Sequence, residues 1–213
     1  MTDSAVGSPP SRRAALIFIF FTVLIDILAF GLIIPVLPHL IKTIGNYDFG
    51  QAAMMSGWFS VAFSAIQFVF APILGALSDR YGRRRVILIS CFGLAVDFTF
   101  MALATSIPMF FIGRVVSAMT SASFSTANAY LADVTAPEKR AAAFGLLGSA
   151  FGIGFVIGPA LGGLLGGIDL RLPFYVASGL AALNFLYGLF VLPESLPLAS
   201  RTPRFEWKLA NPV

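Results

Sequence analysis

Residues Ala14–Pro38 read AALIFIFFTVLIDILAFGLIIPVLP, an apolar run that holds a single charged side chain, Asp26. A helix needs about 20 apolar residues to cross a hydrocarbon core of about 30 Å, because each residue advances it by about 1.5 Å. Within lipid the backbone must satisfy its own hydrogen bonds, and a helix does so inside one segment. The run is therefore predicted to be a transmembrane helix.

Five more runs of this kind follow along the chain. Of its 213 residues, 58% are hydrophobic and 11% are charged, whereas an ordinary soluble domain is about 45–50% apolar and about 25% charged. The runs do not alternate apolar and polar residues, as barrel strands do. We predict an all-α integral membrane protein with six transmembrane helices, at Ala14–Pro38, Ala52–Leu77, Val86–Ala104, Pro108–Leu131, Ala141–Leu165 and Leu172–Leu192.

The positions of the basic residues predict the orientation of these helices. The formal net charge is +4, and most of the 14 Lys and Arg residues fall on one side of the predicted membrane. Basic residues favour the cytoplasmic side, so we expect a multi-pass protein of the cytoplasmic membrane with both termini inside. The charge then reflects topology, and no nucleic-acid partner is expected. The residues on this side are Arg12, Arg13, Arg80, Arg83, Arg84, Arg85, Lys139, Arg140, Arg201, Arg204 and Lys208.

Several classes of site lack the residues they need. The chain has one cysteine, Cys91, and one histidine, His39, so neither an internal disulfide nor a metal site is expected. A membrane enzyme is disfavoured, because no G-x-S-x-G motif is present and His39 lies at the end of a span. A channel is also disfavoured, because the chain has no arginine-periodic voltage sensor and no filter-like loop.

Three ionisable residues lie inside the predicted spans, namely Asp26, Asp97 and Arg114. A charge at the centre of a membrane helix costs at least about 2.5–3.5 kcal/mol on insertion scales and commonly marks a transport pathway. From the helical rise, the three lie ~18, ~16 and ~21 Å from the inner face, so we expect them in one layer near the midplane. They are predicted to line a polar cavity for cargo or protons, and the alternative is a structural ion pair between helices.

Polar residues at helical spacing favour such a cavity. They recur at three- and four-residue steps, which place them on one helical face. For the serines, close packing of small residues is an equally good interpretation. Gln67 and Asn128 are larger and costlier to bury, so they are predicted to face the cavity. The stripes are Ser56, Ser60, Ser64 and Gln67 in the second span, and Arg114, Ser117, Ser121, Ser125 and Asn128 in the fourth.

The fifth span is rich in glycine at four-residue spacing. Small residues at this spacing let helix backbones approach closely, and Pro159 removes a backbone donor, which permits bending. Both tight packing and a hinge are therefore open interpretations. The glycines are Gly154, Gly158, Gly162 and Gly166, with Gly163 and Gly167 as a further pair.

The loop between the second and third spans reads GALSDRYGRRR over Gly75–Arg85. Because it is short, the two helices must be antiparallel neighbours, and Gly82 can supply the positive φ of a tight reversal. Arginines at this boundary anchor at anionic headgroups. That role does not account for the acidic Asp79, which suggests a specific partner. In the next loop on the same side, Asp133 and Glu138 are expected to pair with these arginines.

Together these motifs resemble the major facilitator superfamily. The loop is similar to its signature G-x-L-[small]-D-R-x-G-R-[RK], and Gly154–Gly163 (GFVIGPALGG) resembles the fifth-helix antiporter motif of the drug-export branch. Ile112-Gly113-Arg114 resembles that branch's fourth-helix arginine motif. Asp26–Pro38 (DILAFGLIIPVLP) and Leu192–Ser195 (LPES) resemble the tetracycline/proton antiporters within the branch.

The resemblance implies proton-coupled efflux of a tetracycline-like drug by rocking of two six-helix halves. Protons would be the coupling ion, no cofactor is expected, and a drug–metal chelate stays open as the cargo. The drug and proton cavity would be lined by Asp26, Gln67, Asp97 and Arg114. Asn128 is assigned to it as well, because it continues the polar stripe of the fourth span. The cytoplasmic gate motif would comprise Gly75, Asp79, Arg80, Gly82, Arg83, Arg84 and Asp133. The antiporter helix motif would comprise Gly154, Gly158, Pro159, Gly162 and Gly163.

The family has twelve spans and this chain has six, so the chain resembles an N-terminal half. We expect a disordered cytoplasmic tail over 1–13, the six-helix half over 14–193, and the start of a central cytoplasmic linker over 194–213. Half a transporter has half a cavity. The expected partners are therefore the bilayer, a small-molecule substrate, and a missing C-terminal half or a second copy. The alternatives are a major facilitator transporter of another small solute, and a truncated remnant that does not transport.

Overall fold

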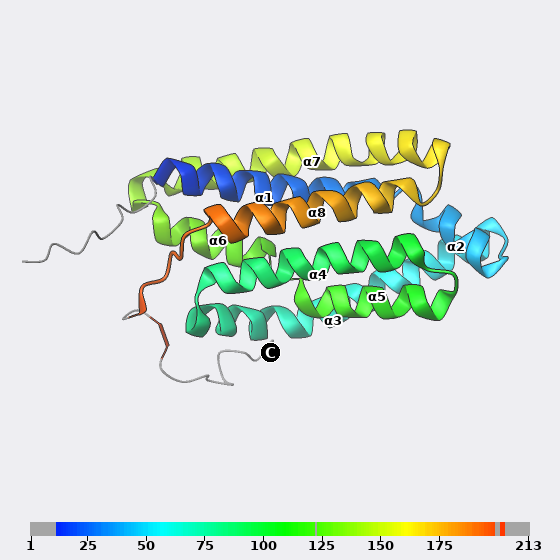
Figure 1. Cartoon of the computed structure of the whole chain (residues 1–213), viewed down its shortest axis with the longest axis horizontal. Coiled ribbons are helices and arrows are strands. Elements are labelled where there is room, and N and C mark those ends of the chain that lie inside the picture. The colour runs from blue at the N-terminus through cyan, green and yellow to red at the C-terminus, as the bar shows by residue number, and fades with distance from the viewer. Residues whose placement is uncertain (1–11, 122, 199–200, 203–213) are drawn as a thin grey trace, which may run out of the picture.

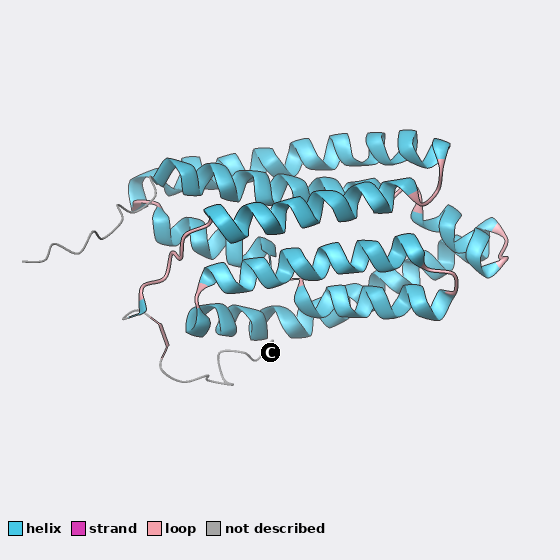
Figure 2. Cartoon of the chain, viewed as in Figure 1, coloured by secondary structure: helices cyan, strands magenta, loops and turns pink. Residues whose placement is uncertain are grey.

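The computed structural model describes residues 12–121, 123–198 and 201–202, and every regular element among them is helical (Figure 2). Six stretches in this part of the chain are long and apolar enough to cross a membrane, which confirms the predicted architecture. They are α1 (Arg12–Ile33), α3 (Phe49–Tyr81), α4 (Arg83–Leu103), the pair α5 (Ile107–Thr120) and α6 (Ser123–Val134), α7 (Arg140–Ile168) and α8 (Leu172–Val191).

The predicted terminal segments lie mostly outside the described residues. Residues 1–11 of the expected tail and residues 199–200 and 203–213 of the expected linker fall there, whereas Arg12 and Arg13 already belong to α1. The expected linker therefore contributes only its first residues to the structure, and these contact the loop between α3 and α4.

The first span ends earlier than predicted. α1 ends at Ile33, and a turn over residues 34–36 leads into the short helix α2 (Leu37–Gly45). Pro35 cannot donate a backbone hydrogen bond to the preceding turn, which favours an end to the helix here. Pro38 lies in the first turn of α2, where a backbone N–H would have no partner within the helix, so proline costs nothing there. With Pro35 after α1 and Pro38 at the start of α2, the predicted first span becomes a transmembrane helix followed by a separate short helix.

The fourth span is interrupted, whereas the sequence predicts one continuous helix over Pro108–Leu131. α5 ends at Thr120, and Ser121 leaves the helical conformation with φ −78° and ψ 79°. The Thr120 hydroxyl donates to the carbonyls of Val116 and Ser117, at 3.2 Å each. Hydroxyls that bond to nearby backbone compete with the helical ladder, and a broken membrane helix is tolerated where protein surrounds it.

The bundle has α7 and α3 at opposite edges (Figure 1). Between them α1 packs against α7 and α8, α4 packs against α8 and α5, and α5 packs against α3. Two clusters of buried apolar residues fill the interior, one near α2 and one near the α3–α4 loop. Large apolar side chains point outward, such as Phe190 at 82% exposure and Ile168 at 77%. A surface of this kind suits contact with lipid tails.

The glycines of α7 fall on two faces with different surroundings. A Cβ on Gly158 would lie 2.8 Å from the Cα of Gly31 in α1, and one on Gly162 would overlap the backbone of Leu32. A Cβ on Gly163 would meet nothing within 4 Å. α7 continues as a helix through Pro159. The first face therefore packs tightly on α1, as the packing interpretation predicts.

Candidate functional site

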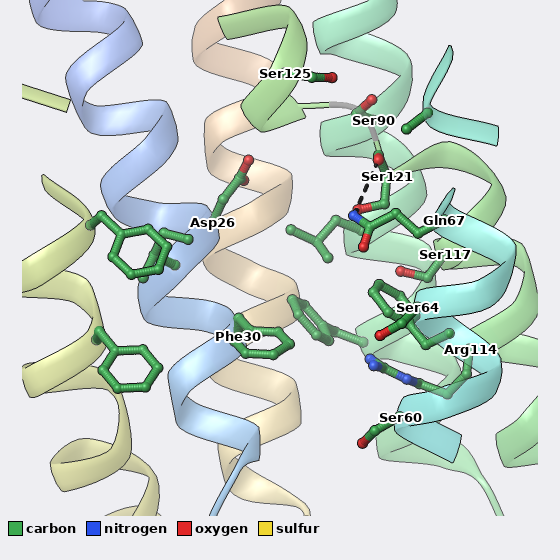
Figure 3. A pocket seen from close by; sticks show the side chains of 17 residues that line it. Asp26, Phe30, Ser60, Ser64, Gln67, Ser90, Arg114, Ser117, Ser121 and Ser125 are labelled. Atoms are coloured by element: carbon green, nitrogen blue, oxygen red, sulfur yellow. Dashed lines mark hydrogen bonds between the residues drawn. The ribbon is translucent and has the colours of Figure 1, made fainter. Parts of the chain in front are cut away.

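A cavity of about 430 Å³ opens in the middle of the bundle, within the range of about 300–1,000 Å³ that ligand pockets occupy. Its walls come from α1, α3, α4, α5, α6 and α7 (Figure 3). The polar lining residues are Asp26, Ser60, Ser64, Gln67, Ser90, Arg114, Ser117, Ser121 and Ser125. Most of the two predicted polar stripes therefore faces one shared space.

The charged residues of the lining lie on different walls. Asp26 projects from α1, and Arg114 and Gln67 lie across the cavity on α5 and α3 (Figure 3). The two charged side chains thus face one space from different walls. A polar ligand with groups of both signs would find a partner for each on opposite walls.

Gln67 supports the interrupted span from across the cavity. Its side-chain amide donates to the Ser121 hydroxyl at 3.0 Å and to the Ser121 carbonyl at 3.5 Å (Figure 3). Ser121 directly follows α5, so its carbonyl lacks the intrahelical partner it would have in a continuous helix. The hydrogen bonds from Gln67 therefore replace the intrahelical bond that the Ser121 carbonyl loses at the break, and they link α3 to the end of α5.

Arg114 is held on two sides. One guanidinium nitrogen, Nη1, lies 3.5 Å from Oδ2 of Asp97, and the guanidinium stacks over the Phe63 ring, 4.3 Å from its centroid. Asp97 is completely enclosed, and Arg114 is 8% exposed. A guanidinium so placed neutralises a buried carboxylate behind it and still presents an edge to the cavity. The ion-pair interpretation and the cavity interpretation therefore both apply to Arg114.

Two residues expected in the cavity are not among its lining side chains. Asp97 is enclosed because α4 and α5 pack closely here, with a Cβ on Gly113 only 3.3 Å from Oδ1 of Asp97. Asn128 lies in α6 and is half-buried. Its predicted position assumes that the periodicity of Arg114 continues, and the break at Ser121 ends that periodicity.

The cavity lining also has an aromatic part, which was not predicted from the sequence. Phe30, Phe63, Phe98, Phe151 and Phe155 all face the cavity. Helical spacing contains a signal for some of them. Phe30 follows Asp26 by four residues, and Phe151 and Phe155 are four apart and stack with centroids 6.0 Å apart. Residues four apart share a helix face. The spacing therefore places Phe30 on the same face of α1 as Asp26, and places Phe151 and Phe155 on one face of α7.

The α3–α4 loop is organised around Arg83. Its guanidinium pairs with Asp79 at 2.5 Å and with Asp133 at 3.2 Å, and it donates to the Ser78 hydroxyl at 2.6 Å. Within this chain Asp79 pairs with its near neighbour Arg83, and Asp133 pairs with a loop arginine as expected. Gly82 has φ +102°, which confirms the positive φ predicted for the reversal.

The remaining loop residues of the predicted gate motif make other contacts. Arg84 donates to the Leu189 carbonyl at 2.6 Å. The Arg80 guanidinium lies over the ring of its neighbour Tyr81, 5.2 Å from the centroid. A Cβ on Gly75 would meet nothing within 4 Å, so its surface is open. The structure therefore brings Asp79, Arg83 and Asp133 together and leaves Gly75 and Arg80 beside that cluster.

Known proteins of similar sequence include drug-resistance proteins and a protein named for the major facilitator superfamily. The tetracycline resistance protein, class C, of Escherichia coli is 42% identical over 202 residues, which are 91% of this chain and 50% of that protein. Major facilitator superfamily domain-containing protein 10 of Homo sapiens is 32% identical, over 92% of this chain and 47% of that protein. This chain thus spans about half the length of the curated relatives it matches.

Solved structures agree with these sequence relatives. The human organic anion transporter MFSD10 (TETRAN) superposes with a TM-score of 0.80 at 31% identity, over 92% of this chain and 51% of that one. A bacterial homolog of the human lysosomal transporter Spinster, inward-facing and unoccupied, superposes with a TM-score of 0.72 at 21% identity and shares the fold. Both transporters are matched over about half of their length.

The family assignment rests on most of the described chain. Residues 19–210 match the sequence model of the Major Facilitator Superfamily. The match contains the α3–α4 loop with its arginine cluster, the glycine-rich α7, and every residue that lines the cavity. By its sequence, its six-helix fold and its relatives, this chain belongs to the major facilitator superfamily.

Proposed function

We propose that the chain acts as the N-terminal half of a proton-coupled exporter for a tetracycline-like drug in the cytoplasmic membrane, with both termini inside. The observation that carries the proposal is the central cavity, where Asp26 and Arg114 lie on different walls. Its support from comparison is the 42% identity to the class C tetracycline resistance protein. Ionisable residues within membrane helices commonly serve proton and substrate pathways.

Each wall of the cavity has a role in this proposal. Asp26 takes up a proton on one side of the membrane and releases it on the other. Arg114 and the serines bind the polar edge of the drug, and the phenylalanines cover its rings. A drug–metal chelate suits the same cavity as cargo. The proposal assigns the chain transport and no catalysis.

The partner in this proposal is a second six-helix unit. The cavity is one-sided, because its lining comes from one bundle, and related transporters are about twice as long. Either a C-terminal half made as part of a longer chain or separately, or a second copy of this chain, would close it. Alternating access then follows from rocking of the two units about the shared cavity.

Coexpression tests the proposal directly. The chain is produced in drug-sensitive Escherichia coli with the C-terminal half of the class C tetracycline resistance protein, and proton-driven tetracycline uptake is measured in everted vesicles. We expect uptake with both halves, little with this chain alone, and loss of uptake in Asp26→Asn with normal membrane insertion. Asp48→Asn, at the capping position of α3 outside the cavity, is the matched control and should keep uptake.

The proposal fails if the two halves insert and purify together and yet move no tetracycline. It also loses its proton site if Asp26→Asn transports normally. Chains that insert but never associate would favour a remnant that does not transport.

A second candidate cargo is an organic anion. One relative is described as a human organic anion transporter, and Arg114 supplies a cation to the cavity. The same vesicles separate the two candidates when tetracycline is replaced by a panel of monovalent organic anions. Uptake of anions without uptake of tetracycline would favour this cargo.

A further inference from the structure

The chain that follows α8 lies against the α3–α4 loop instead of leading away from it. We define the strap as residues 192–198 together with 201–202. We propose that the strap holds this loop in position, with Glu194 as a positioning residue that caps α4 and thereby sets the place of Arg83. This inference concerns the loop itself and does not depend on the cargo of the cavity.

Glu194 supplies a cap that α4 cannot provide for itself. The residue before α4 is Gly82, which has no side chain to accept a hydrogen bond. The first N–H groups of a helix have no intrahelical partner. Oε1 of Glu194 accepts from the backbone N–H of Arg83 at 2.8 Å and, more weakly, from that of Arg84 at 3.5 Å. A carboxylate is also favoured at the positive end of a helix.

Gly82 makes room for this carboxylate. A Cβ at position 82 would lie 2.6 Å from Cδ of Glu194 and 2.9 Å from Nη2 of Arg201. Both distances are too short for real atoms, so a larger residue must displace the Glu194 carboxylate and the Arg201 guanidinium from the end of α4. The glycine therefore serves two purposes, the positive φ of the reversal and the space in which Glu194 reaches the helix end.

Further contacts fix the strap on both sides of Glu194. The Tyr130 hydroxyl donates to the carbonyl of Pro193 at 3.1 Å, and the Ser195 hydroxyl donates to Asp133 at 3.2 Å. The Thr202 N–H donates to the carbonyl of Asp79 at 3.2 Å. The strap thus contacts both acidic residues that pair with Arg83. It bonds to the carboxylate of Asp133 and to the backbone carbonyl of Asp79.

Arg201 completes the arrangement from within the strap. Its guanidinium pairs with Glu194 at 3.5 Å and donates to the carbonyl of Leu196 at 3.3 Å. The Leu196 N–H in turn donates to Glu194 at 3.2 Å. The strap is therefore folded around the same carboxylate that caps α4, so loss of Glu194 releases the strap and the helix end together.

The physical consequence is a connection between the end of the last span and the Arg83 cluster. The backbone N–H of Arg83 is bonded to the strap, and its side chain is bonded to Asp79 and Asp133. Movement of the strap therefore shifts the start of α4 and with it the arginine that the two acidic residues share. In a transporter that rocks, this ties the chain leaving the sixth span to the α3–α4 loop.

Hydrogen exchange of the chain in lipid nanodiscs tests the strap. In Glu194→Ala, the amides of residues 82–86 should exchange about fivefold faster, because capping side chains contribute about 1 kcal/mol. The amides of the strap should accelerate in the same variant. Glu194→Gln keeps an acceptor oxygen and loses the charge, so it should fall between the wild type and Glu194→Ala.

Two glycine variants extend the test, one as a second way to displace the cap and the other as its matched control. Gly82→Ala should reproduce the effect of Glu194→Ala, whereas Gly75→Ala, with open space around its Cβ, should leave exchange at 82–86 unchanged. Unchanged exchange in α1 and α8 establishes that each variant is folded. The proposal is overturned if Glu194→Ala leaves residues 82–86 unchanged, or if it accelerates only the strap.

Discussion

At the scale of single residues, the buried charges are arranged so that each has an electrostatic partner or faces the cavity. Asp97 is completely enclosed and depends on Arg114, which lies 3.5 Å away. Removing water from a charge is costly, and the partner offsets that cost only while it is present. Helical rise predicts a shared depth for the two residues, but only the packing of α4 against α5 makes them a pair.

The first prediction follows from this dependence. Arg114→Met should destabilise the chain by about 3–5 kcal/mol, because it leaves the Asp97 carboxylate buried and unpaired. The double variant Arg114→Met with Asp97→Leu should regain most of the loss. Unfolding in mixed micelles with increasing SDS measures both, and Lys42→Met, at an exposed site in α2, is the control. A double variant no more stable than the single one would contradict the pairing.

At the scale of helices, two features decide how the bundle fits together. The glycine face of α7 brings its backbone against α1 near Gly31, and the break after α5 is supported by Gln67 from α3. Both are contacts between neighbouring helices. The four-residue spacing of the glycines predicts that a close contact exists, but it does not identify α1 as the partner.

The second prediction compares two glycines of the same helix. Gly158→Ala should cost about 1–3 kcal/mol, because the added methyl group would press on the backbone of Gly31. Gly163→Ala should be neutral or stabilising by up to about 1 kcal/mol, since its Cβ enters open space and alanine favours the helix. The same SDS titration measures both. Equal effects at the two positions would contradict the tight α1–α7 packing.

The third prediction concerns the break in the fourth span. Gln67→Leu removes both bonds to Ser121 and should lower stability by about 0.5–1.5 kcal/mol, the net value of a typical hydrogen bond. Hydrogen exchange should also rise locally around residue 121. Ser64→Ala, on the same wall of the cavity, is the matched control. If exchange near residue 121 is the same in Gln67→Leu and in the wild type, Gln67 does not support the break.

At the scale of the whole molecule, the basic residues are distributed unequally between the two ends of the bundle. The exposed segment around Lys42 and Thr43 in α2 lies at one end of the bundle, and η1 (Pro137–Lys139) lies at the other (Figure 1). Basic residues gather in the loops of the η1 end, and such loops favour the cytoplasm. The proposed orientation rests on this asymmetry.

The fourth prediction tests that orientation. In a Cys91→Ala background, Thr43→Cys should react with a membrane-impermeant maleimide in intact cells, because α2 is expected outside. Glu138→Cys should react only after the membrane is opened. Both positions are exposed, so accessibility within the protein does not separate them. Labelling of Glu138→Cys in intact cells would reverse the proposed topology.

The sequence by itself determined the fold class, the six spans, the reversal at Gly82 and most of the polar residues that line the cavity. These features depend on each segment alone. The residues of a segment set the free energy of its transfer into lipid and decide which side chains share one face of its helix. Only the tertiary structure decided that Asp97 lies behind Arg114, that Asn128 is not among the lining side chains, and that the fourth span is broken. It alone also brought Glu194 to the start of α4. Each of these depends on which helices become neighbours, and packing between segments distant in the chain sets that.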